Sequence, residues 1–343
     1  MSANRREKLL FQVINQHPHH IREMNYHFKT IHKRGRLWVV EPKEGTPQDL
    51  LEKLKPITGR ERSYLWDQPL FHEKRWAQDE LEILGLIGGI SPQTIRKDVE
   101  LLSSFRTRRA GTIENYEALQ AVKQRLSKYN LKVKEICYRP KSCSLVAERK
   151  GSTRSPDVVL VMSHIDSVGH DFAGADDNAS GVAVLLEIIR ITETYNNKKT
   201  FRFFISNGEE QGMMGARHYV TELKKTGDIH HIKFALNMDM VAYNSNNIVE
   251  FETDPLFERE AQWLANIAHT YTLLKAKITL GAWGSDHLPF VNAGIPAIMT
   301  IEDWDTMSPC YHKACDIPEG LNYDYAAEIG KLNAAAMMRR DLL

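Results

Sequence analysis

Hydrophobic positions over the last two thirds of the chain follow two different periods. Residues 157–164, 200–206 and 234–240 are short apolar runs, the pattern of strands covered on both faces. Residues 180–195 and 214–225 place apolar side chains every three or four positions, which predicts amphipathic helices. This alternation predicts an α/β fold, a three-layer sandwich around a central mixed, mostly parallel sheet. Further helices are predicted over 115–129, 257–271 and 324–338, and further strands over 132–138, 142–150 and 296–301.

The first 95 residues have a different pattern, which is polar, basic and often interrupted by proline, glycine and tryptophan. Short helical periods occur over residues 6–14, 46–54 and 77–87. We therefore expect an N-terminal helical segment over 1–95 and an α/β domain over 96–343. The helix predicted over 180–195 has Ser180 as its expected N-cap.

Composition and charge exclude several classes of partner. The chain has 343 residues, 42% of them apolar, and a formal net charge of +1. A nearly neutral chain has no strong field for nucleic acid or an anionic membrane surface, so we expect neither as a partner. No apolar run has the length of a membrane span, and the start of the chain has no long apolar stretch of a signal peptide. We therefore expect a cytoplasmic protein.

The four cysteines are too few for a disulfide scaffold, and their spacing does not match a structural zinc site. In a cytoplasmic protein free thiols are the first expectation. A short-loop disulfide between Cys310 and Cys315, which bracket His312, is the alternative.

Polar side chains follow the predicted strands, at the ends where a parallel sheet gathers its ligands. Taken singly, each has an ordinary structural explanation, such as a helix cap or a turn residue. Taken together, they must pair with one another or bind a cation, because buried unpaired carboxylates are costly and few basic residues lie at these strand ends. The residues are His164, Asp166, Asp176, Asp177, Glu209, Glu210, Asp239, Asp286, His287 and His312.

Imidazole nitrogens and carboxylate oxygens are ligands that suit zinc, with no thiolate required. Two histidines and three carboxylates suit two ions better than one, with an aspartate bridging ions about 3.5–4 Å apart. We predict two metal sites of similar affinity that are lost together in acid, because the histidines must be deprotonated to bind metal. Asp166, two residues after His164, is the expected acceptor for that imidazole's other N–H.

Six motifs occur in one order along the chain: MSHIDSV, GADDNASG, SNGEEQG, NMDM, GSDHLPF and YHKACD. Together they closely resemble those of the zinc-dependent aminopeptidases typified by bacterial leucyl aminopeptidases, over roughly residues 98–343. The resemblance implies a phosphorylase/hydrolase-like α/β sandwich. One departure is minor: the family often has Asp-Gly before the glutamate pair, where this chain has Asn207 and Gly208.

The resemblance also implies a role for each site residue and a cofactor of two Zn²⁺ per chain. Glu209 would be the general base that acts on a zinc-activated water, while its neighbour Glu210 would be a metal ligand. A cis peptide bond would join Asp177 to Asn178. The implied ligands are His164 and Asp239 for one zinc, Glu210 and His312 for the other, and Asp177 as the bridge.

The implied reaction is release of the N-terminal residue of a peptide. The side-chain pocket is expected to be apolar, so a leucine-like residue would be preferred without strict specificity. Other readings remain open: a single-zinc glutaminyl cyclase-like acyltransferase, a carboxypeptidase, or a non-enzymatic binding domain on the same fold. Residues 1–95 could be a propeptide, a permanent cap or an oligomerisation element. Candidate pocket residues, chosen because they flank ligand positions and equally compatible with core packing, are Met240, Trp304, Met307 and Tyr311.

Overall fold

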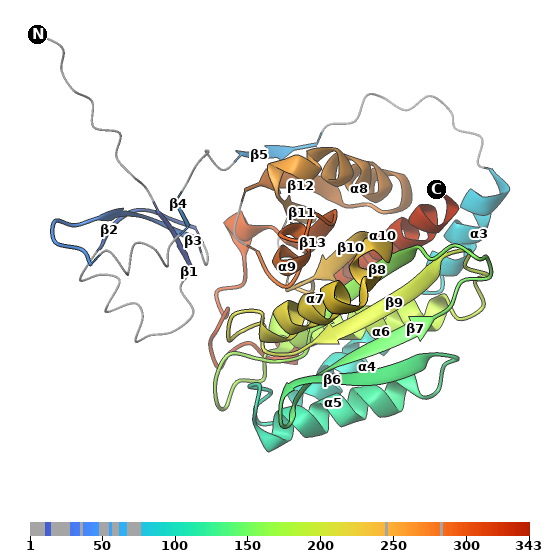
Figure 1. The fold of residues 1–343 in the computed structure, drawn as a ribbon, viewed down its shortest axis with the longest axis horizontal. Helices are drawn as coiled ribbons and strands as arrows, with labels where there is room; N and C mark the ends of the chain where they lie inside the picture. The colour runs from blue at the N-terminus through green and yellow to red at the C-terminus, as the bar shows by residue number, and fades with distance from the viewer. Residues whose placement is uncertain are drawn as a thin grey trace, which may run out of the picture. The chain divides into compact units, whose positions relative to one another are not determined.

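The computed structural model describes residues 11–14, 28–34, 37–47, 55–56, 62–66, 77–243, 246–281 and 284–343 (Figure 1). Contacts divide the chain into two compact units. One comprises residues 1–62 with 281–283, and the other comprises 63–280 with 284–343. Each unit is described by itself.

The smaller unit contains a four-stranded sheet in the order β2-β3-β1-β4. β1 pairs antiparallel with β3 and β4, and β2 pairs antiparallel with β3. A helix was predicted over residues 6–14, but residues 11–14, the part that the structure describes, form a strand, so the prediction is wrong there. Most of the predicted 46–54 helix lies outside the described residues. The strands are β1 (Phe11–Ile14), β2 (Phe28–Arg34), β3 (Leu37–Pro42) and β4 (Lys55–Pro56).

The larger unit contains a nine-stranded mixed sheet in the order β5-β12-β11-β13-β10-β8-β9-β7-β6 (Figure 1). Its centre is parallel, from β13 through β10 and β8 to β9, while β11–β13 and β9–β7 are antiparallel pairs. The strands are β5 (Arg62–Leu65), β6 (Lys132–Arg139), β7 (Ser142–Arg149), β8 (Val158–His164), β9 (Thr200–Ser206), β10 (Ile232–Met238), β11 (Ile248–Thr253), β12 (Lys275–Leu280) and β13 (Ala297–Glu302).

Helices cover both faces of this sheet, as the sequence pattern predicts (Figure 1). α3 falls where a helix was predicted, and within the described residues it is the first helix of the larger unit. Among the residues that the structure describes, no helix has the length and apolar character needed to cross a bilayer. The helices are α3 (Gln78–Ile87), α4 (Pro92–Ser103), α5 (Ile113–Leu126), α6 (Gly181–Ile191), α7 (Met214–Thr226), α8 (Glu258–Tyr271), α9 (Leu288–Val291) and α10 (Tyr323–Leu342).

The alternation of side chains along the central strands explains the two buried faces. Val159 and Val161 of β8 belong to the apolar core that includes α6 and α10. On the other face Phe204 of β9 packs against Tyr219 of α7, which contacts Phe290 of α9 edge-on. Because β8, β9 and β10 are parallel, their carboxyl ends meet at one edge of the sheet. The predicted α/β architecture is confirmed, and this edge carries the polar motifs.

Candidate metal centre

Strand ends place the first two predicted ligands. His164 is the last residue of β8 and pairs in register with Ser206 at the end of β9. Asp239 directly follows β10, which is parallel to β8. Both side chains are almost completely buried. The sheet itself therefore brings an imidazole and a carboxylate together.

Asp177 lies in a kinked turn, η1 (Ala175–Ser180), before α6, and its φ and ψ of −103° and 87° are not helical. Gly174 begins the turn with a left-handed φ of 57°, and a Cβ there would lie 2.5 Å from the carbonyl oxygen of Asp177, so only glycine fits. The Asp177–Asn178 peptide bond is cis, as the resemblance implies. Ser180 is not the predicted side-chain cap of α6; its hydroxyl donates to the Asp176 carbonyl and accepts from the Val241 amide.

The predicted ligands form two groups of converging donor atoms that share Asp177. In the inner half, His164 Nε2 lies 3.2 Å from Asp239 Oδ1 and 3.4 Å from Asp177 Oδ1. In the outer half, His312 Nε2 lies 3.0 Å from Asp177 Oδ2 and 3.1 Å from Glu210 Oε2. The two carboxylate oxygens of Asp177 thus face different histidines, the arrangement that a bridging ligand requires.

The electrostatics of both halves favour a cation. Burial lowers the pKa of His164, but Asp239 and hydrogen bonds to Asp166 and Asp239 outweigh burial and raise that pKa well above its usual value. Burial also opposes protonation of His312, yet Glu210 and Asp177 raise the pKa of His312 to about 9. A field that holds a proton on a buried imidazole also attracts a metal cation. Nitrogen and carboxylate donors of this kind fit zinc.

Two aspartates hold the loops that carry the ligands. Asp166 Oδ1 and Oδ2 accept the backbone N–H groups of Glu209 and Glu210 at 3.2 and 3.1 Å. Its backbone carbonyl lies 3.1 Å from His164 Nδ1, nearer than its carboxylate at 3.6 Å. The predicted contact between Asp166 and the imidazole is therefore made mainly by the main chain, and the carboxylate binds the glutamate loop.

The carboxylate of Asp316 likewise accepts two backbone N–H groups, here from the turn that carries Asp177. Its Oδ1 accepts the Asp176 N–H at 2.8 Å, and its Oδ2 accepts the Asp177 N–H at 3.1 Å. Our sequence reading did not identify this residue, although it closes the YHKACD motif four positions after His312. Asp316 thereby links the loop of the outer histidine to the loop of the shared carboxylate.

Glu209 and Glu210 are both buried but differ in position. Glu210 belongs to the outer donor group, whereas Glu209 belongs to neither group found among the described residues. The negative charge of Glu209 nevertheless contributes to the raised pKa of His164, so its carboxylate is close to the site.

The four predicted pocket residues lie together. Met240 is buried with Met299 and Ile301, and the other predicted residues pack against this cluster. Tyr311 stacks on the ring of His312, with centroids 3.9 Å apart. Met240 follows the ligand position Asp239 and Tyr311 precedes His312, so the apolar cluster adjoins both halves. The other members are Trp304 and Met307.

Asp286 and His287 do not join either donor group among the described residues. Burial raises the pKa of Asp286 to about 7, and its carboxylate accepts a hydrogen bond from the Ser206 hydroxyl. Burial lowers the pKa of His287 to about 3, so this imidazole is neutral.

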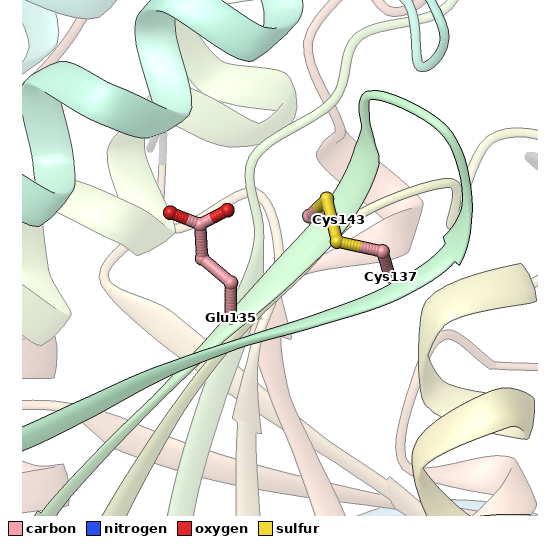
Figure 2. Close-up of side chains that lie close together, drawn as sticks. All are labelled: Glu135, Cys137 and Cys143. Atoms are coloured by element: carbon pink, nitrogen blue, oxygen red, sulfur yellow. A yellow bond between two sulfur atoms is a disulfide. The ribbon is translucent and has the colours of Figure 1, made fainter.

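The cysteines form two disulfides, Cys137–Cys143 and Cys310–Cys315, so the expectation of free thiols is wrong and the short-loop alternative is right for the second pair. Cys137 and Cys143 face each other across the β6–β7 hairpin. Glu135 lies beside them and completes a third group of donor types (Figure 2). Because both sulfurs are in the disulfide, this group offers no thiolate and is not a metal site.

Comparison with known proteins finds aminopeptidases among the relatives of this chain. The chain is 28% identical over 229 residues to Aminopeptidase YwaD of Bacillus subtilis, covering 65% of this chain and 49% of that protein. The match thus spans about half the length of that relative. A probable leucine aminopeptidase of Trichophyton verrucosum is 26% identical over 273 residues, covering 73% of each chain.

Solved structures extend the comparison. The zinc aminopeptidase BSAP of Bacillus subtilis matches with a TM-score of 0.54 and 27% identity, covering 58% of this chain and 50% of that one. LapB of Legionella pneumophila matches with a TM-score of 0.71 at 18% identity, covering 98% and 99%, and so shares the fold. The sequence profile of Peptidase family M28 matches residues 144–337, more than half of the chain and all of the predicted ligands. The resemblance to zinc-dependent aminopeptidases is confirmed, and the chain belongs to Peptidase family M28.

Proposed function

We propose that this protein is a di-zinc aminopeptidase that removes an apolar, leucine-like residue from the N-terminus of peptides. The observation that carries the proposal is the position of Asp177, whose two oxygens face the histidines of two separate donor groups. A single-zinc acyltransferase needs only one such group, so the cyclase alternative is not favoured. Both relatives compared by sequence are aminopeptidases by name.

The proposed ligands are His164 and Asp239 in the inner half, Glu210 and His312 in the outer half, and Asp177 between them. When bound, zinc polarises the substrate carbonyl and lowers the pKa of water toward neutrality. Five protein ligands are enough to hold two ions and leave positions open for substrate and water.

Glu209 is the proposed general base. Its carboxylate takes the proton of the attacking water and then gives it to the nitrogen of the leaving amine. Asp166 orients this glutamate, because it binds the backbone N–H of Glu209 and of the adjacent Glu210. One carboxylate therefore fixes the base and a ligand in a single loop.

The side chain of the substrate's first residue is proposed to lie against the apolar cluster. Thioether and aromatic surface beside the ligands comes from Met240, Trp304, Met307 and Tyr311. Such a surface separates residues that differ by one methylene by only about 1–3 kcal/mol. We therefore expect a preference for leucine-like residues over alanine, and not strict specificity.

Two substitutions of adjacent glutamates test these roles. Glu209→Gln keeps the shape of the side chain but removes the base, so kcat should fall by about 10²–10⁴-fold while zinc content stays the same. Glu210→Gln removes a charged ligand, so zinc content should fall and added zinc should partly restore activity.

Assays would use aminoacyl-anilides together with elemental analysis. The roles are wrong if Glu209→Gln is the variant that loses zinc, or if both variants keep near-normal turnover. At most one zinc per wild-type chain at saturating metal would contradict the di-zinc proposal.

We also propose that the chain works in an oxidising environment rather than the cytoplasm. Disulfides persist in such compartments, and this chain has two within its described residues. Thiol titration of protein isolated without reductant tests this.

Residues 1–95 are proposed to be a segment without catalytic groups, because every proposed ligand and the base lie between His164 and His312. Assays of long peptides and of anilides with protein lacking only residues 1–62, which belong to the smaller unit, would show whether that unit limits access to the site.

A further inference from the structure

A short turn after β13 carries Trp304, one of the proposed pocket residues. The turn is the 3₁₀ helix η4 (Trp304–Thr306), and Asp303 is its N-cap. Asp303 accepts the N–H of Asp305 with Oδ1 at 3.3 Å, and accepts Asn246 Nδ2 with Oδ2 at 2.7 Å. A turn of this length has little intrinsic stability, so its position depends on what binds it.

The ammonium of Lys277 binds both sides of this turn. Lys277 lies on β12, its side chain is only 8% exposed, and its Nζ is 2.6 Å from Asp303 Oδ1 and 2.8 Å from Asp305 Oδ2. These carboxylates belong to the residues immediately before and after Trp304. A buried ammonium requires such partners, and bonds between two charged groups are about twice as strong as neutral ones.

A third carboxylate extends the contact to the tryptophan itself. Glu250 on β11 is the parallel cross-strand partner of Lys277, and its Oε2 lies 3.0 Å from Lys277 Nζ. The same Oε2 accepts the backbone N–H of Trp304 at 3.1 Å, while Oε1 accepts the Thr279 hydroxyl. Residues 303, 304 and 305 are therefore each bound by Lys277 or by its partner.

The indole of Trp304 connects this turn to the metal centre through packing contacts. Trp304 packs against the cluster of Met240, Met299 and Ile301. It also meets the ring of Tyr311 edge-on, with centroids 6.1 Å apart, and Tyr311 in turn stacks on His312. A displacement of the turn would therefore change the shape of the apolar surface beside the ligands.

We propose that Lys277 is a positioning residue that fixes Trp304 as a wall of the substrate side-chain pocket, and so sets the preference for large apolar residues. The choice of substrate rests on the proposed function; the placement of Trp304 by Lys277 does not. The ion pairs of Lys277 are with Glu250, Asp303 and Asp305, none of which is a proposed zinc ligand, so its effect is expected to reach the substrate through the turn that carries Trp304.

Lys277→Met tests the proposal because it keeps the length and apolar stem of the side chain and removes the ammonium from all three carboxylates at once. Lys275→Met is the matched control, since Lys275 lies on the same strand and is exposed. The first measurement is ¹⁹F NMR of full-length protein labelled with 5-fluorotryptophan, with the Trp304 signal assigned through Trp304→Phe. The signal should shift or broaden in Lys277→Met and stay unchanged in Lys275→Met.

The second measurement is kcat and KM for leucyl and alanyl anilides. In Lys277→Met the ratio of kcat/KM for leucine to that for alanine should fall by about tenfold, within the range that loss of apolar pocket contact produces. KM for the leucyl substrate should rise, with zinc content unchanged. A purely structural defect would instead lower kcat for both substrates together. Trp304→Ala should lower the leucine-to-alanine ratio of kcat/KM by a similar factor. Combining Lys277→Met with Trp304→Ala should not lower this ratio further.

If Lys277→Met does not fold, Asp305→Asn takes its place. The Asp305 side chain is 60% exposed, and this variant removes the charge of one of the three carboxylates while Lys277 keeps its ion pairs with Asp303 and Glu250. Its effects should be smaller and in the same direction. An unchanged Trp304 signal, or an unchanged substrate ratio in an active enzyme, would overturn the proposal. Wild-type protein without activity on any anilide would contradict the proposed function, while the NMR measurement would still decide the role of Lys277.

Discussion

The two halves of the metal centre are built on different supports. The inner half, His164 and Asp239, lies at the ends of adjacent parallel strands, and both side chains are at most 1% exposed. The outer half, Glu210 and His312, lies on loops, and the His312 side chain is 17% exposed with a left-handed φ of 55°. The sheet ladder fixes the first half, whereas the second depends on contacts between loops.

Two aspartates hold the loops that carry the ligands. Asp166 binds two consecutive amides of the glutamate loop, and Asp316 binds two consecutive amides of the Asp177 turn. Charge-assisted bonds of this kind are stronger than neutral ones. The outer half nevertheless depends on these loop contacts and His312 is partly exposed, so we expect the outer half to bind metal more weakly than the inner half, in contrast to the similar affinities predicted from the sequence.

The largest effects are expected from the histidines. His164→Ala should remove the inner zinc and destabilise the metal-free protein by about 3–5 kcal/mol, because the buried carboxylates lose their partner. His312→Ala should leave about one zinc per chain and destabilise less, since that site is partly open to water. Zinc analysis and urea denaturation of both variants measure this. Equal losses of zinc and of stability in the two variants would contradict the difference that we propose between the inner and outer halves.

Intermediate effects are expected from the aspartates that hold the loops. Asp316→Ala and Asp166→Ala should each weaken zinc binding by about 10–100-fold, the usual result of losing a partner behind the ligands. Asp316→Asn keeps one acceptor oxygen and should recover part of the loss. Glu319→Ala, an exposed carboxylate three residues on, is the control. Competition with a chelator gives the zinc affinities. An unchanged zinc affinity in Asp316→Ala would show that the Asp177 turn keeps its position without the Asp316 carboxylate.

The smallest expected effect is a change with pH in the thermal stability of the metal-free protein. Glu210 and Asp177 outweigh burial and raise the pKa of His312 to about 9 from an ordinary 6.5. A raised folded-state pKa gives stability that is complete below the unfolded value and is lost as pH rises through the folded value. The Tm of metal-free protein should therefore fall between pH 6.5 and about 9, and less so in His312→Gln.

Zinc-loaded protein should not show this decline, because the imidazole nitrogens then bind metal instead of a proton. Thermal scans in EDTA and in excess zinc across that pH range make the comparison. A Tm of the metal-free protein that rises with pH would contradict the assignment.

Much of this architecture could be predicted from the sequence because it depends on local pattern. The apolar run over 200–206 coincides with β9, and the polar residues after β8 and β10 converge at one sheet edge, as parallel strands require. The five predicted ligands lie in the two donor groups for this reason.

What could not be predicted depends on contacts between distant residues. Asp316 binds amides about 140 positions earlier, and Lys277 binds carboxylates 26 and 28 positions later, with no local pattern to mark either contact. The pairing of Cys137 with Cys143 follows from the register of a hairpin. In residues 11–14 strand pairing overrides a short helical period.

The Cys310–Cys315 disulfide closes a loop between positions five apart, and His312 lies inside it. A ring of this size has few conformations, so most of the chain entropy that an open loop would lose on capturing an ion is already lost when the sulfurs join. We therefore expect the closed ring to favour metal binding by the outer histidine, because less chain entropy remains to be lost when an ion is captured.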